Sequence, residues 1–237
     1  MRTIKSRGKL NIINNIPQGK GSFKTADFLE KLVNGFIKYS GNYMEIVNES
    51  PFAYRERQLN SLFGPAMADF TDAFLTEIPA IRKNKAAKTE SYGWVDFWAR
   101  YRKVDFYLEL KHSYGSYNSG VITKETMDLW AKAKDQTQNC SKSLLRMEDS
   151  DGIMVLPVQV IPIYEGIYFE NEPSSIENTE RLLEIQNFYH DELETSANWS
   201  ALWIIHKDLA YDSYHVNGDK RVYYSAVLIV SNVTDIQ

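Results

Sequence analysis

Apolar residues recur at helical spacing early in the chain, after a polar start. The first 22 residues are rich in Asn, Lys and Gly and predict a loose arm. Within residues 25–41, apolar side chains return every three or four positions, which predicts an amphipathic helix that ends near Gly41. A second helix is expected over residues 51–72, because a serine that can cap the helix precedes a proline at its first position.

The middle of the chain changes from helical to strand-like periodicity. Only Tyr101 and Arg102 lie between two of the expected strands, which predicts a tight hairpin turn. No internal repeat or linker interrupts the pattern, so residues 1–237 are predicted to form one domain of mixed α and β structure. The expected elements are strands over 74–82, 92–100 and 103–111, a helix over 123–147, a strand over 153–163, an acidic helix over 175–195, and strands over 201–206 and 222–230.

The composition is that of an ordinary globular protein. Hydrophobic residues make up 43% and charged residues 24% of the 237 residues, which is enough apolar material for a core. The single cysteine, Cys140, cannot form an internal disulfide and favours a reducing compartment. No apolar run reaches the length of a membrane helix and the start lacks a signal-peptide core, so we expect a cytoplasmic protein without membrane contact.

Charge is distributed unevenly along the chain. The formal net charge of −4 argues against a polycation that coats nucleic acid without specificity. Residues 82–103, however, contain seven basic and two acidic side chains, whereas residues 163–195 contain nine acidic side chains and only Arg181 as a basic one. We therefore expect an anionic ligand near the basic hairpin.

Three charged residues of this hairpin could carry out chemistry together. Glu109 and Lys111 project on the same side of their strand, because side chains alternate with period two. A turn at 101–102 would place Asp96 opposite Tyr107 and diagonal to Glu109, about 7–8 Å away. Two carboxylates and a backbone carbonyl suit Mg²⁺, and a neighbouring lysine can orient water and neutralise charge on a phosphate. The residues thus suggest metal-assisted hydrolysis of a phosphodiester.

Asp96 followed by Glu109-Leu110-Lys111 resembles the signature of the PD-(D/E)XK nuclease superfamily. Val95 takes the place of the proline in the family pattern, a departure that the family often tolerates. The expected order of helix, three antiparallel strands, helix and strand also resembles that family over residues 50–165. The resemblance implies a three-layer α/β/α restriction-endonuclease-like fold with a mixed central sheet, with residues 166–237 as a C-terminal elaboration.

The resemblance also implies roles for individual residues. Asp96, Glu109 and the backbone carbonyl of Leu110 would bind Mg²⁺, or Mn²⁺ in its place, and Lys111 would assist the nucleophilic water. Glu56 matches an accessory glutamate on the first core helix. A glutamine on the next helix would be Gln136 or Gln138, of which at most one can face the site. The implied partner is DNA, and cutting both strands would require a homodimer. The cations expected to contact DNA are Arg55, Arg82, Lys83, Arg100, Arg102 and Lys103, together with Arg57, Lys132 and Lys134.

Several alternatives remain open at this point. The chain could be a catalytically inactive nuclease-fold domain that binds nucleic acid or protein. It could also be an unrelated α/β domain, in which Glu109 and Lys111 would be fully exposed and paired only with neighbours. Asp105 lies on the same strand face as Glu109 and is a second candidate for the signature aspartate. We expect Glu77 to be an ordinary exposed residue and His112 to be structural or to face solvent.

Overall fold

The structure is a computed structural model of the chain. It describes residues 2–4, 7–84, 89–119, 121–140, 149–168, 170–176, 178–193, 197–210, 212–216 and 220–233. For residues 2–4, 82–84, 89–91 and 212–216 of these, the backbone alone is described.

A mixed sheet forms the centre of the molecule. Eight strands follow one another in the order β1-β2-β8-β10-β7-β5-β4-β3, while β6 pairs with β7 and β9 pairs with β10. All pairs are antiparallel except β5 with β7 and β6 with β7. The strands are β1 (Arg2–Ile4), β2 (Gly8–Asn14), β3 (Ala73–Asn84), β4 (Thr89–Tyr101), β5 (Val104–His112), β6 (Gly115–Ser116), β7 (Gly152–Tyr168), β8 (Trp199–Ile205), β9 (Asp212–Val216) and β10 (Lys220–Ser231).

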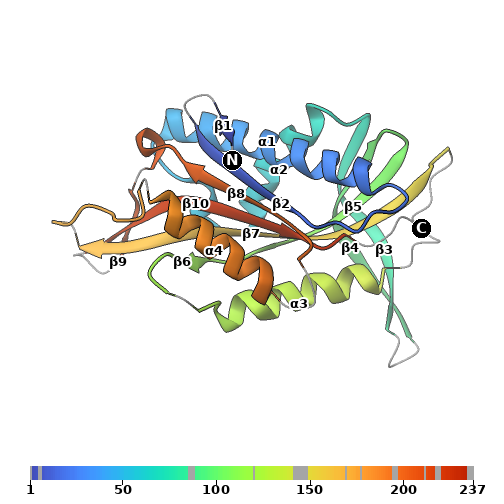
Figure 1. The fold of residues 1–237 in the computed structure, drawn as a ribbon. Coiled ribbons are helices and arrows are strands. Elements are labelled where there is room, and N and C mark those ends of the chain that lie inside the picture. The colour runs from blue at the N-terminus through green and yellow to red at the C-terminus, as the bar shows by residue number, and fades with distance from the viewer. Residues whose placement is uncertain are drawn as a thin grey trace.

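Helices cover both faces of this sheet, so the α/β class predicted from the sequence is confirmed (Figure 1). Helices α1 (Ser22–Val47) and α2 (Glu56–Ala68) lie on one face, above a large apolar core that includes Phe28, Phe36, Phe63 and Trp203. Helices α3 (Lys124–Gln138) and α4 (Thr179–Glu192) lie on the other face. The described residues also form two short 3₁₀ helices, η1 (Pro51–Ala53) and η3 (Lys207–Leu209). Among the described helices, none has the length and apolar character needed to cross a membrane.

The N-terminal part differs from its sequence-based prediction. The loose arm expected over residues 1–22 is wrong for residues 8–14, because β2 pairs with β8 along its full length. Helix α1 also continues past Gly41 to Val47. A Cβ atom at Gly41 would lie 2.7 Å from Cδ of Arg7, so the glycine permits close packing at this point of the helix.

The hairpin between β4 and β5 turns one residue later than predicted. Arg102 and Lys103 form the turn, with φ values of 50° and 62°. Positive φ at both central residues is the type I′ arrangement that suits the twist of a two-residue hairpin. Phe97 consequently pairs with Leu108, and Tyr107 pairs with Trp98 rather than with Asp96. The same register continued by one step brings Asp96 level with Glu109.

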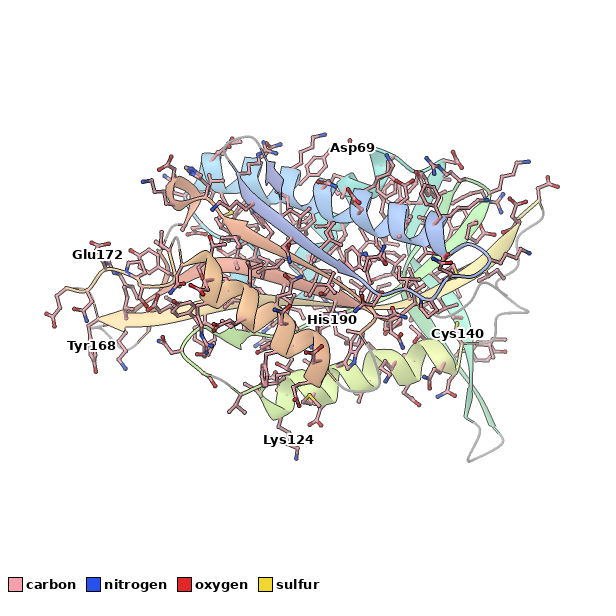
Figure 2. The ribbon with its side chains drawn as sticks, in the orientation of Figure 1. Asp69, Lys124, Cys140, Tyr168, Glu172 and His190 are labelled. Carbon is pink, nitrogen blue, oxygen red and sulfur yellow. The ribbon has the colours of Figure 1, made fainter. Side chains whose placement is uncertain are left out.

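The helix predicted over 123–147 ends at Gln138 in the described part of the chain, and residues 141–148 lie outside it. Cys140 is therefore not in the middle of a helix. It lies just beyond α3 and is buried against the start of β7 and the β3–β4 hairpin (Figure 2).

Candidate active site at the fork between β4 and β5

Strands β4 and β5 separate at the position of Asp96 and Glu109. Their pairing ends at Phe97 and Leu108; beyond it β5 continues beside β7 to His112, whereas β4 continues beside β3. In Figure 1 the β3–β4 hairpin accordingly extends away from the rest of the sheet. The Asp96 carboxylate lies in the fork, where its Oδ2 accepts a 2.6 Å hydrogen bond from the backbone N–H of Leu110.

The backbone of β4 is irregular at Asp96, which explains how the carboxylate enters the fork. Val95 packs into the small apolar cluster around Tyr107, but Phe97 packs into the main core. In a regular strand, residues two apart share one face, so the strand must twist between them. On the neighbouring strand, Glu77 has a φ of 54°. Glu77 is exposed as expected, but this unusual backbone conformation carried no signal in the sequence.

The ammonium group of Lys111 lies at the centre of the site. Its Nζ is 2.9 Å from Oε1 of Glu109, 2.7 Å from the carbonyl oxygen of Leu110 and 3.9 Å from Oδ2 of Asp96. Glu109 is only 3% exposed and Lys111 only 6%. The full exposure of these two side chains that was expected for an unrelated domain is therefore not observed. Buried charges of this kind persist only where they are paired, and they are typical of functional sites.

Glu56 joins this group from the first turn of α2. Its carboxylate accepts a hydrogen bond from the backbone N–H of His112 and interacts electrostatically with Lys111 and Asp96. Burial raises the pKa of Glu56, the charge of Lys111 opposes the shift, and that of Asp96 adds to it. The structure thus brings together the four residues that the sequence had suggested as catalytic.

A cavity of about 730 Å³ opens beside these residues, between the start of α2, the end of β5 and the start of α3. Glu56 lines it and also interacts with Lys111 and Asp96, so cavity and charged group adjoin. Tyr114 stabilises one wall by donating its hydroxyl to the carbonyl oxygens of Ala53 and Tyr54, at 2.9 and 3.0 Å. The volume lies in the range of small-ligand sites, and sequence reasoning had not identified it.

His112 is structural, in agreement with its sequence-based interpretation, although it also lines the cavity. Its Nε2 lies 3.2 Å from the carbonyl oxygen of Phe52, and its ring contacts that of Tyr114 edge to face. Burial lowers the pKa of His112 from 6.5 to about 4, although the contact with Phe52 opposes the shift. The imidazole is therefore neutral at pH 7 and donates its Nε2–H to the carbonyl.

This lowered pKa predicts a loss of stability in mild acid. Between pH 6.5 and pH 4 the unfolded chain binds a proton at His112 that the folded protein does not, so stability falls as pH falls through that window. We expect about 2 kcal/mol of unfolding free energy to be lost between pH 7 and pH 5 from this group. Urea unfolding of the wild type and of His112→Gln at both pH values measures it. An equal loss in the variant would contradict a neutral buried His112.

The two candidate glutamines lie on different sides of helix α3. Gln136 is half-buried, and its Oε1 is buried without a hydrogen-bond partner among the described residues, whereas Gln138 is exposed. Gln136 lies four residues after Lys132, whose charge reaches Glu56. Residues four apart share a helix face, so Gln136 and not Gln138 lies on the side of the site.

Three of the predicted DNA-contacting cations, Arg100, Arg102 and Lys103, lie away from this site. Arg100 binds Asp105 through two hydrogen bonds of 3.0 and 3.1 Å, and Arg102 pairs with Asp27 at 3.0 Å. Lys103 is exposed at the same turn, about 20 Å along the strands from Asp96. Arg100, Arg102 and Lys103 are thus not grouped with the candidate site, contrary to the expectation from local charge. The side chains of Arg82 and Lys83 lie outside the described residues, whereas Arg55 is exposed and lines the cavity.

Asp105, the second candidate aspartate, makes structural contacts away from the fork. It is fully buried, and besides Arg100 it accepts a 3.2 Å hydrogen bond from Nε1 of Trp98. These contacts lie at the turn end of the hairpin, three residue pairs beyond the last one before the fork. Asp96 is therefore the aspartate that lies beside Glu109 and Lys111.

The oxygen atoms around Lys111 fit a divalent cation. In the described part of the chain no three His, Cys, Asp or Glu side chains form a ready-made metal centre. The ammonium group instead contacts oxygens of Glu109 and Leu110 and lies near Asp96. Mg²⁺ prefers hard oxygen ligands, such as a pair of carboxylates with a backbone carbonyl. With Glu56 there are three acidic side chains near the single ammonium group of Lys111. A cation could use these oxygens once the ammonium moves aside.

No protein-family model, curated protein or solved structure matches this chain. What the protein does must therefore follow from the chemistry of its own residues. A buried lysine among three carboxylates, beside an open cavity, can hold a cation, orient water and neutralise an anionic substrate.

Proposed function

We propose that the protein is a metal-dependent nuclease that hydrolyses phosphodiester bonds in DNA, with Mg²⁺ or Mn²⁺ as cofactor. The observation that carries this proposal is the convergence of Asp96, Glu109, the Leu110 carbonyl and Lys111 at the fork between β4 and β5. Each is the residue that the resemblance to the PD-(D/E)XK superfamily assigns to metal binding or to the attacking water.

The order of elements around the site supports the same proposal. Helix α2, antiparallel strands β3, β4 and β5, helix α3 and strand β7 follow one another, and β7 lies beside β5 and parallel to it. This is the arrangement of helix, three antiparallel strands, helix and strand expected of a restriction-endonuclease-like core. Helices on both faces of the sheet agree with its three layers.

The residues divide the chemistry among them. Asp96, Glu109 and the Leu110 carbonyl would hold the cation, which when bound polarises the phosphate and lowers the pKa of a coordinated water. Lys111 orients the attacking water and offsets the negative charge that grows on the phosphate. Glu56, whose pKa is raised by burial and which interacts electrostatically with Lys111, would accept the proton that the water loses. Arg55, which lines the cavity, and Lys132, whose charge reaches Glu56, would supply positive charge for the DNA backbone.

The direct test is cleavage of end-labelled single- and double-stranded DNA in Mg²⁺ or Mn²⁺. We expect metal-dependent cleavage that falls by about 10²-fold or more in Asp96→Asn, because a metal ligand contributes several kcal/mol to catalysis. Asp128→Asn, an exposed position on α3, is the matched control and should cleave like the wild type.

Two other outcomes would overturn the proposal. DNA binding without cleavage, with Mg²⁺ binding absent by calorimetry, would favour a catalytically inactive nuclease-fold domain. Equal cleavage by wild type and Asp96→Asn would place the activity elsewhere. Because one site of this kind cuts one strand at a time, cleavage of both strands of a duplex would need a second copy of the chain.

A further inference from the structure

The part of the β3–β4 hairpin beyond the fork forms an arm, which consists of residues 78–84 of β3 and 89–95 of β4. Among the described strands these segments pair only with each other, since β4 leaves β5 at Phe97. Figure 1 shows the arm extending from the sheet past the end of α3. One face of its base packs inward, where Ala80 and Val95 contact the cluster around Tyr107.

The opposite face of the arm carries exposed aromatic side chains. Tyr92 is 89% exposed and Trp94 is 60% exposed. The two residues share a face because they lie two apart on β4, about 7 Å from each other. Pro79, which is also exposed, pairs with Trp94, and Ile81 pairs with Tyr92. Single exposed apolar residues are common on protein surfaces, but a cross-strand patch of this kind is typical of an interaction site.

The position of Pro79 argues against a protein strand as the partner. β3 is the outermost strand of the sheet, so it is the edge to which a further strand could add. A proline lacks the N–H that such a strand would bind, and prolines on edge strands discourage this pairing. Flat π-faces, in contrast, bind nucleic acid bases by stacking, whatever the base.

Charge and position favour a nucleic acid strand. In the sequence, residues 82–88, RKNKAAK, include four basic and no acidic residues. Trp94 precedes Asp96 by only two residues, so the aromatic side chains lie on the same strand as the candidate metal ligand and close to it along the chain. Proteins that bind single-stranded nucleic acid combine positive charge with aromatic stacking in this way.

We infer that the arm binds single-stranded DNA by stacking successive bases on Tyr92 and Trp94, and that it thereby guides an unpaired strand to Asp96. The inference rests on the proposed nuclease function for its substrate. Bases inside a duplex are stacked on one another and cannot stack on these side chains. The preferred substrates are therefore single strands and unpaired ends.

Binding of a fluorescein-labelled 20-mer of deoxythymidine, measured by anisotropy in EDTA, tests this directly. Trp94→Ala should weaken binding by about tenfold, and the double variant with Tyr92→Ala by about tenfold more. Trp94→Phe keeps a stacking ring and should bind nearly like the wild type. Phe23→Ala, a 73% exposed aromatic on α1, is the matched control and should have no effect.

The outcomes separate this inference from the proposed function, because binding in EDTA needs no catalysis. Weakened binding in Trp94→Ala with no cleavage by the wild type would support the arm and overturn the nuclease. Cleavage by the wild type with unchanged binding in both arm variants would support the nuclease function and overturn the role of the arm. Equal affinity of the wild type for the 20-mer and for a duplex of the same length would also overturn the single-strand preference.

Discussion

Replacing Lys111 by methionine is expected to lower the rate of metal-dependent DNA cleavage by about 10²- to 10⁴-fold. The ammonium group is the only cation within 4 Å of both Glu109 and Asp96 among the described residues. Methionine keeps the length and apolar stem of the side chain but cannot orient water or neutralise a phosphate. Single-turnover rates at saturating DNA and Mg²⁺ measure the effect. Lys103→Met, at the exposed turn of the same hairpin, should cleave within twofold of the wild type.

The same variant should bind metal at least as tightly as the wild type. In the structure, the ammonium group contacts oxygens of Glu109 and Leu110 that a cation would use, so the two compete for them. Calorimetric titration with Mg²⁺ should show this directly. Full activity in Lys111→Met would remove the lysine from the mechanism, and loss of metal binding would contradict the competition.

The sequence predicted the order of the elements around the site because its periodicity is strong there. Leu108 and Leu110 alternate with Glu109 and Lys111, and every one of these side chains is buried. The order of residues was thus enough to identify the charged group and the strand that carries it. The distance between Asp96 and Glu109 depended on the turn, and local rules placed the turn one residue too early.

The physical reason is that the turn lacks its usual residues. A type I′ turn favours Asn and Gly, whereas this chain uses Arg102 and Lys103. Tyr101 looks like a turn residue by position, yet it is buried and donates its hydroxyl to Asp27, which belongs to α1. Tyr101 is instead the last residue of β4, where it pairs with Val104, and its side chain contacts a residue far away in the sequence. Local patterns do not contain that information.

Other differences have the same origin. Residues 8–14 include several polar side chains and only become a strand because β8, near the far end of the chain, pairs with them. The count of basic residues over 82–103 likewise did not include Asp27, which is distant in sequence, lies on α1 and pairs with Arg102. The cavity beside Glu56 exists only after α2, β5 and α3 have packed together. Sequence patterns therefore predicted which residues form the site and which strand face they share better than they predicted contacts between residues far apart in the chain.

A substitution of Arg100 is expected to change the stability of the protein without changing its catalytic activity. Replacing Arg100 by methionine leaves the fully buried Asp105 carboxylate with Trp98 Nε1 as its remaining hydrogen-bond donor among the residues that the structure describes. Removing one partner of a buried ion pair typically costs about 3–5 kcal/mol, and we expect about 3 kcal/mol here because Arg100 is partly exposed. Urea unfolding at pH 7 measures this loss.

Adding Asp105→Asn to Arg100→Met should recover much of that stability, because the buried negative charge is then removed. The rate of DNA cleavage by the folded fraction should remain unchanged in both variants, since Asp105 and Arg100 lie at the turn end of the hairpin and not in the fork. A stable Arg100→Met protein with weakened DNA binding would instead support the sequence-based expectation that Arg100 contacts DNA. The hairpin would then bind its substrate at the turn as well as at the fork.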